Sequence, residues 1–194
     1  MHARDAAELA RAQERGERLR FLFFWGHRPP RGGGVGPGCL SQWWEAPFTL
    51  EETVYRTAEH FMMAEKARLF GDGEAREAVL AAAHPGEAKK LGRTVRGFDE
   101  TTWVGHRRAV VVRGNLAKFG QHRDLGDFLL GTGERVLVEA SPVDRIWGIG
   151  LAADDERAGD VSRWRGQNLL GFALMDVREQ LHALHRAEVT PTRQ

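Results

Sequence analysis

Residues 57–70 constrain this chain most, because a helix-forming segment carries ionisable residues inside its apolar face. The segment is rich in Ala, Met, Leu, Glu and Lys, with Thr57 in the position of an N-cap and Gly71 as a stop signal. On a wheel of about 100° per residue, Glu59 and Lys66 fall near the middle of the apolar arc. They lie along one line of the helix, about 10 Å apart at ~1.5 Å per residue.

A carboxylate and an ammonium are costly to bury without partners. One explanation is a structural ion pair, or two side chains that extend to solvent. The other is that the helix lines a polar cavity, in which Lys66 has a lowered pKa and acts as a nucleophile and Glu59 has a raised pKa and acts as a general acid. Glu65 and Arg68 point the other way and are expected to be ordinary solvated charges.

Length and composition favour one soluble domain. The chain has 194 residues, 42% of them hydrophobic, and a formal net charge of +1. That charge gives no whole-chain electrostatic case for nucleic-acid or membrane binding. No apolar run reaches the ~18 residues of a membrane span, and the N-terminus has no apolar signal region. We therefore expect a cytoplasmic protein with no membrane partner.

The single cysteine, Cys39, excludes an internal disulfide framework and a cysteine-based metal site. The histidines show no helical spacing with acidic partners that would indicate a metal site. We therefore predict neither a metal nor a cofactor.

The pattern of elements predicts a mostly α-helical (α+β) fold with a few short strands, in a single domain at residues 20–185. Residues 1–19 are expected to be an N-terminal extension, either a solvated helix or a frayed segment, and residues 186–194 a disordered tail. Strands are expected at 19–25 and 135–140, a hairpin within 48–55, and helices at 58–70, 73–83, 86–91, 101–119, 124–130 and 169–185.

The segment 139–150, which places Glu139, Asp144 and Trp147 in a strand end and loop, is the second candidate for function, because loops held by a scaffold often carry it. Trp147 in this loop, and Trp103, are suited to stacking on a base or to the core. Asp144 suits either ribose hydroxyls or a turn cap. Asn168 begins a helix, where an N-cap is the ordinary role.

Arg28 lies in a loop rich in Gly and Pro, residues 26–38. The glycines do not follow the pattern of a phosphate-binding P-loop. The basic side chain is suited to contacting a phosphate or to being simply solvated.

Several motifs in order resemble the NADAR family of YbiA-like N-glycosidases over roughly Phe21 to Leu181. The motifs are Tyr55-x-Thr57-x-Glu59-His60-x-Met62-Met63-x-x-Lys66-Ala67, Glu87-Ala88-Lys89-x-Leu91-Gly92-Arg93, Asn115-x-x-Lys118-Phe119, Leu137-Val138-Glu139-Ala140-Ser141-Pro142-x-Asp144-x-x-Trp147-Gly148-x-Gly150 and Gln167-Asn168-x-Leu170-Gly171. The resemblance implies a mostly helical fold without a metal that hydrolyses N-glycosidic bonds to ribose phosphates. One branch of the family acts on ribosylaminated pyrimidine intermediates of riboflavin synthesis, and another removes ADP-ribose from guanine in nucleic acid.

The resemblance favours a catalytic role for Glu59 and Lys66. Both substrates join ribose to an exocyclic amine, which can open to an imine that a neutral Lys66 attacks to form a Schiff base. Glu59 would then shuttle protons to the departing amine and from water. In the alternative, the sugar ring stays closed, and Glu59 or Asp144 stabilises an oxocarbenium-like state and activates water.

Binding roles follow from the same resemblance. Trp103 and Trp147 would flank the base, and Asp144 and Asn168 would hold ribose hydroxyls. The residues considered for the phosphate are Arg28, Arg93 and Arg107.

Three functions compete. The first is a metabolite-repair N-glycosidase whose small-molecule substrate is ribosylated and phosphorylated. The second is a hydrolase of ADP-ribosylated guanine in DNA or RNA, served by a basic patch of Arg107, Arg108 and Arg113. The third is a non-catalytic sensor of ADP-ribose. The chain has Ser41-Gln42-Trp43 where many members have Ser-Asn-Phe, and an acidic insertion, residues 154–160, is expected beside the site.

Overall fold

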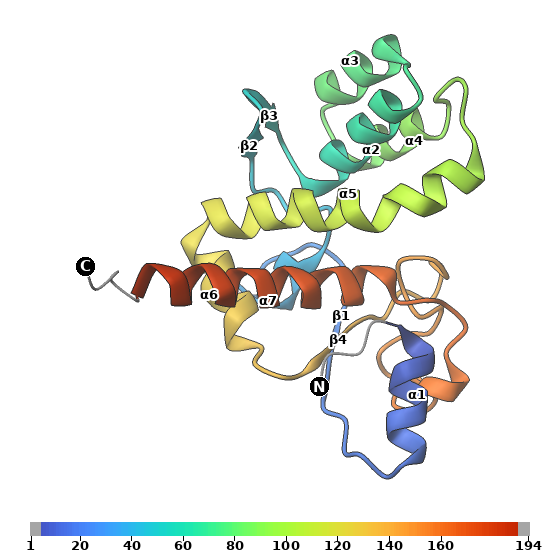
Figure 1. The fold of residues 1–194 in the computed structure, drawn as a ribbon, viewed down its shortest axis with the longest axis vertical. Helices are drawn as coiled ribbons and strands as arrows, with labels where there is room; N and C mark the ends of the chain where they lie inside the picture. Colours follow the sequence, from blue (N-terminus) through green and yellow to red (C-terminus); the bar gives the residue numbers. More distant parts are fainter. Residues whose placement is uncertain (1–4, 190–194) are drawn as a thin grey trace.

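The computed structural model of the protein describes residues 5–189 and has a mostly helical fold with two small two-stranded sheets, as the sequence predicted (Figure 1). In chain order the elements are α1 (Ala6–Glu14), β1 (Phe21–Phe24), the 3-10 turn η1 (Pro37–Leu40), β2 (Phe48–Leu50), β3 (Thr53–Tyr55), α2 (Ala58–Leu69), α3 (Gly73–Ala81), α4 (Pro85–Gly92), α5 (Glu100–Gln121), α6 (Arg123–Gly131), β4 (Val136–Glu139), the 3-10 turn η2 (Val161–Arg163) and α7 (Leu169–Val189). Within residues 5–189, no helix is long and apolar enough to cross a lipid bilayer.

The two longest helices, α5 and α7, lie side by side through the middle of the molecule (Figure 1). Helices α2, α3 and α4 gather on one side of α5, while β4 packs against α7. Phe119 of α5, Phe172 of α7 and Leu137 of β4 are fully buried in the core. The fold therefore places α2 and the end of β4 on the same central framework.

Strands β1 and β4 pair in parallel, from Phe21 opposite Val136 to Phe24 opposite Glu139. Asn168, which adopts a left-handed backbone conformation with φ of 54°, fastens β4 to the start of α7. Its Oδ1 accepts a hydrogen bond of 2.9 Å from the Glu139 amide, and its Nδ2 donates one of 2.9 Å to the Leu137 carbonyl. These two bonds fix the end of β4, where the loop at 141–150 begins.

The predicted cap of α2 is confirmed, since Thr57 Oγ1 accepts a hydrogen bond from the His60 amide. The predicted helices and strands are present, with ends that differ by a few residues. Helix α7 continues to Val189, beyond residue 186, where a tail was expected. Residues 1–4 of the expected extension and 190–194 of the expected tail lie outside the described residues.

Helix α1 is docked, so the expectation of a solvated or frayed segment is wrong for residues 6–14. Leu9 and Ala12 share one face and are buried. The Gln13 amide joins the helix to the acidic insertion, since its Nε2 donates to the Gly159 carbonyl at 2.9 Å and its Oε1 accepts from the Val161 amide at 3.0 Å. The insertion therefore packs on α1.

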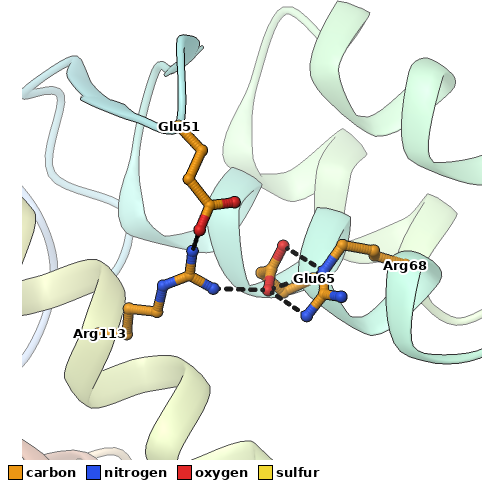
Figure 2. Close-up of polar contacts among 4 residues, drawn as sticks. All are labelled: Glu51, Glu65, Arg68 and Arg113. Atoms are coloured by element: carbon orange, nitrogen blue, oxygen red, sulfur yellow. Dashed lines mark hydrogen bonds and ion pairs between the residues drawn. The ribbon is translucent and has the colours of Figure 1, made fainter.

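Glu65 is not a solvated charge, which corrects the expectation for this side of α2. Its side chain is 5% exposed and accepts hydrogen bonds from Arg68 at 3.0 Å and from Arg113 of α5 at 3.2 Å (Figure 2). Arg113 also pairs with Glu51 in the hairpin. The polar side of α2 is thus covered by α5 and tied to it, whereas Arg68 is largely exposed as expected.

Candidate active site

A cavity of about 930 Å³ opens beside α2, within the size range of small-molecule sites. Its walls come from α2, α4, the end of β4 and three loops, with residues 25–27, 41–43 and 141–147 of the loops taking part. Glu59 and Lys66 both line this cavity, together with Asp144 and Trp147. The structure therefore brings together the ionisable residues of α2 and the second candidate loop.

Glu59 lies in the first turn of α2 and is 3% exposed. Burial raises the pKa of its carboxyl to about 7, although Lys89 and a hydrogen bond from the Trp43 side chain both lower it. Its Oε1 atom is buried and has no hydrogen-bond partner within residues 5–189. A buried polar atom is normally paired, so this carboxyl lacks a partner that a purely structural group would have. A carboxyl that titrates near neutral pH is suited to proton transfer.

Lys66 lies two turns further along the helix and is partly buried. Its Nζ donates a hydrogen bond of 2.8 Å to the Gly92 carbonyl and lies 4.0 Å from the centroid of the Phe98 ring. Burial lowers the pKa of this amine. Lys89, and not Lys66, is the ammonium group that acts most strongly on the Glu59 carboxyl. Glu59 and Lys66 therefore do not form the structural ion pair considered from the sequence.

Asp144 has the turn-cap role considered for it and also lines the cavity. Its Oδ1 accepts hydrogen bonds from the amides of Ile146 at 2.9 Å and Trp147 at 2.8 Å, which is a turn cap. Its Oδ2 lies 4.0 Å from Nζ of Lys89, and the residue lines the cavity. Asp144 therefore orders the Trp147 loop and presents one carboxylate oxygen beside an ammonium.

Glu139 and Lys89 complete a cluster of charges around the cavity; the sequence placed Glu139 in the candidate segment 139–150 without a role and gave no role to Lys89. Burial, followed by repulsion from Asp144, raises the pKa of Glu139 to about 8. Lys89 of α4 acts on both Glu59 and Glu139. The sequence gave only a weak signal that these two residues share a site. Lys89 is part of a family motif and Glu139 ends a strand, and no periodic pattern links them.

The mouth of the cavity is apolar. Trp25 is 62% exposed and Val143 is 85% exposed, and both line the opening with Ile146 and Trp147. Trp25 was missed because it ends the apolar run 19–25, which reads as a buried strand. Exposed aromatic and aliphatic groups around a polar floor are suited to an aromatic ring in the ligand.

Four predicted binding residues lie outside the cavity lining. Asn168 is fully buried and its side chain bonds the backbone of β4, so the expected ribose contact is replaced by a structural role. Arg107 is buried and donates to Gln167 Oε1 at 3.2 Å. Trp103 is buried, with its ring centroid 5.8 Å from Lys66 Nζ, and Arg28 is exposed in its loop.

Of the three arginines considered for a phosphate, Arg93 is the one among the cavity-lining residues. The acidic insertion was expected beside the site, but residues 154–160 do not line the cavity.

Helix α5 holds the segment at 39–43 that forms one wall. Lys118 Nζ donates to the carbonyls of Cys39 at 2.6 Å and Ser41 at 3.0 Å. Asn115 Nδ2 donates to Gln42 Oε1 at 2.7 Å, which turns the Gln42 amide nitrogen away from α5. That Nε2 atom is buried and has no partner in the described part of the chain. The wall therefore offers a hydrogen-bond donor close in sequence to Trp43.

Lys118→Met is expected to change the pH dependence of stability. Burial lowers the pKa of Lys118 from 10.5 to about 7, so the unfolded chain binds more protons between these values. The stability that Lys118 contributes is therefore present above pH 10.5 and lost as the pH falls to 7. In urea denaturation, the advantage of the wild type over Lys118→Met should grow from pH 7 to pH 10. Lys90→Met, at an exposed position of α4, is the control and should show no such trend.

Residues 5–189 contain no group of three or more His, Cys, Asp or Glu side chains placed to hold a metal ion.

Comparison with known proteins places this site in a family. The family model described as NADAR domain matches residues 23–182. A protein named N-glycosidase from Acanthamoeba polyphaga mimivirus is 40% identical over 166 residues, which cover 83% of this chain and 96% of that protein. The protein named N-glycosidase YbiA from Escherichia coli is 31% identical over 144 residues, which cover 74% of this chain and 81% of that protein.

The solved NMR structure of Escherichia coli YbiA matches with a TM-score of 0.71 and 26% identity, over 91% of this chain and 93% of that one. The family model spans most of the sequence, and the structural match covers the helices and strands that build the cavity. The chain therefore belongs to the NADAR domain family.

Proposed function

We propose that the protein is an N-glycosidase that hydrolyses the bond between C1 of a phosphorylated ribose and an exocyclic amine of a base. The preferred substrates in this proposal are ribosylaminopyrimidine intermediates of riboflavin biosynthesis, which makes the protein a metabolite-repair enzyme. The observation that carries the proposal is that Glu59 and Lys66 line one cavity with their pKa values moved toward neutrality, upward for the acid and downward for the amine. Relatives that share the family are named N-glycosidases.

In the proposed reaction protonated Glu59 gives its proton to the ring oxygen, the ring opens to a protonated imine at C1, and the neutral Lys66 amine attacks that carbon. One N–H of Lys66 remains bonded to the Gly92 carbonyl, which leaves the lone pair of the amine for the attack. The proton that Lys66 loses on addition goes to the Glu59 carboxylate. Protonated Glu59 then gives a proton to the base amine, and the C1–N bond breaks with its electron pair moving to that nitrogen.

Water completes the cycle. It adds to C1 of the protonated lysyl imine, and Glu59 takes one proton from this water. The other proton of the water moves to the Lys66 nitrogen as the C1–N bond breaks, so Lys66 leaves as the free amine, the ribose aldehyde forms and Glu59 is protonated for the next cycle. No redox step occurs, and the net reaction is the addition of one water across the N-glycosidic bond. The closed-ring alternative keeps Lys66 out of the covalent steps and uses Glu59 or Asp144 to stabilise the oxocarbenium-like state.

Substrate contacts follow from the cavity lining. Trp147 and Trp25, which line the cavity, would stack against the departing base, and Arg93 and Lys89 would supply positive charge for the phosphate. Asp144 presents one carboxylate oxygen for a ribose hydroxyl.

Incubating the purified protein with the ribosylaminopyrimidine phosphate, with borohydride present, tests this function. We expect free base to be released and a ribose phosphate adduct to appear on Lys66 in the peptide mass spectrum. The adduct should be absent in Lys66→Ala and unchanged in Lys90→Ala, which removes an exposed lysine. Activity that survives in Lys66→Ala without any adduct would discard the Schiff-base route in favour of the closed-ring route.

A hydrolase of ADP-ribosylated guanine is the second candidate, favoured by the exposed apolar mouth, which is suited to an unpaired base. The basic patch expected for nucleic acid is weakened, because Arg107 is buried and Arg108 and Arg113 pair with acidic residues. Release of guanine from ADP-ribosylated DNA, without turnover of the pyrimidine, would select this function. Release of neither base would favour a sensor of ADP-ribose.

A further inference from the structure

We propose that Glu139 is a second catalytic acid of this cavity, which delivers the proton to the departing amine while Glu59 exchanges protons with Lys66 and water. This assignment rests on the N-glycosidase function proposed above and divides between two carboxyls the proton transfers given there to Glu59 alone. The argument starts from the position of Glu139 and continues through its missing partner and its neighbours.

The backbone of Glu139 is held firmly at the end of β4. Its amide donates to Asn168 Oδ1 at 2.9 Å, and its carbonyl accepts a hydrogen bond of 2.9 Å from the Ile149 amide. A Cβ atom at Gly148 would lie 2.8 Å from the same carbonyl, so only glycine allows the loop to pass this closely. A catalytic side chain needs such a fixed origin to be positioned well.

The carboxyl of Glu139 lacks a structural partner. Its Oε2 atom is buried and has no hydrogen bond to any residue that the structure describes, and the residue lines the cavity. Glu59 has an unpartnered buried oxygen on the same cavity. Purely structural buried carboxyls are normally bonded, because an unpaired one is costly. Two carboxyl residues that line one cavity, each with a buried oxygen left unpartnered, point to a functional role for both.

The charges around the two carboxyls separate their tasks. Burial raises the pKa of Glu139 to about 8. Asp144 and Glu59 also disfavour its ionisation, whereas Lys89 favours it. Burial also raises the pKa of Glu59, to about 7, with a further contribution from Asp144, while Lys89, the Trp43 hydrogen bond and Arg93 favour its ionisation. More neighbours therefore favour ionisation at Glu59 than at Glu139, which suits Glu139 to donating a proton and Glu59 to exchanging one.

Two carboxyls suit a reaction with two proton tasks. In the first half, the C1–N bond breaks with its electron pair on nitrogen, and the Glu139 proton moves to that nitrogen while Glu59 takes the proton released by Lys66. In the second half, protonated Glu59 returns its proton to Glu139 through the released base or water. Glu59 then accepts a proton from the attacking water.

The decisive experiment measures how turnover depends on the leaving amine. A graded series of N-(5-phosphoribosyl) anilines, from weakly to more strongly basic amines, is hydrolysed by the wild type and by Glu139→Gln. Gln is the same size as Glu but cannot transfer a proton. We expect a loss of ~10²–10⁴-fold in kcat for the most basic amine, a much smaller loss for the least basic, and little change in KM.

The pH profile gives an independent readout. In the wild type, kcat should fall as the pH rises through about 8, because Glu139 loses its proton, and this alkaline fall should be absent in Glu139→Gln. Glu45→Gln, at an exposed position outside the cavity lining, should behave like the wild type in both measurements. If Glu139→Gln does not fold, Glu139→Asp is measured in its place. With the shorter acid, kcat should still depend more steeply on the basicity of the leaving amine than in the wild type.

Two failures are distinguishable. In the first, the wild type hydrolyses the series, and the Glu139 variants show the same dependence on amine basicity and the same alkaline fall in kcat as the wild type. That result would overturn the role of Glu139 and leave the proposed function standing. A wild type that hydrolyses no N-riboside at all would overturn the proposed function and this role together.

Discussion

Replacing Glu59 with Gln is expected to lower the rate of base release by ~10²–10⁴-fold, the range typical of removing a general acid–base group. The substitution keeps the size of the side chain and removes its proton transfer. Glu59 is 3% exposed and has no partner for its Oε1 among residues 5–189, so Gln breaks no structural bond at that atom. The measurement is kcat on the ribosylaminopyrimidine phosphate, with circular dichroism to verify the fold.

The same variant should become relatively more stable as the pH rises. The folded-state pKa of Glu59 is raised from 4.5 to about 7 by burial, so its contribution to stability is present below pH 4.5 and lost as the pH rises through 7. Gln has no such dependence. The stability of Glu59→Gln relative to the wild type should therefore increase between pH 5 and pH 8, with a limiting slope of ~1.4 kcal/mol per pH unit. Unchanged turnover, or a difference in stability that does not vary with pH, would contradict the catalytic account of Glu59.

Gly171→Ala is expected to destabilise the fold by about 3 kcal/mol or more, the largest effect we foresee for a single methyl group. A Cβ atom at this position of α7 would lie 2.1 Å from the Leu137 carbonyl and 2.5 Å from Asn168 Nδ2. The first obstacle is backbone in β4, and the second is the amide that fastens β4 to α7, so neither can move aside cheaply. Urea denaturation measures the loss.

Gly105→Ala is the matched control, because it also adds one methyl group to a long helix. Nothing lies within 4 Å of a Cβ atom at Gly105 in α5. Ala should stabilise that helix by ~0.5–1 kcal/mol relative to Gly. If the two variants were equally stable, the close contact between α7 and β4 would not be the constraint described above.

The sequence predicted those parts of the molecule whose information is local. The cap at Thr57 and the stop at Gly71 define α2 in the sequence, and the helical wheel places Glu59 and Lys66 in its apolar arc. Both residues then line the cavity because that arc faces the interior of the fold. A period of 3.6 residues and a few capping residues carry this information without any knowledge of neighbours.

The errors concern residues whose environment comes from distant parts of the chain. Glu65 was assigned to solvent because the wheel contains no information about α5, which supplies Arg113. Asn168 was considered for ribose, whereas its left-handed backbone turns its amide onto β4, 29 residues earlier. Glu139 and Lys89 meet because of the way α4 and β4 pack beside α2, and no spacing in the sequence reports that meeting.

Helix α2 is enclosed almost all round, since nine of its twelve residues are buried. This leaves it little room to accept substitutions, so the part of the protein that holds Glu59 and Lys66 is poorly suited to evolving new specificities. The mouth has the opposite character, because Trp25 and Val143 contact solvent and carry little of the folding free energy. A laboratory selection for new leaving groups would therefore do best to randomise the mouth and leave the helix untouched.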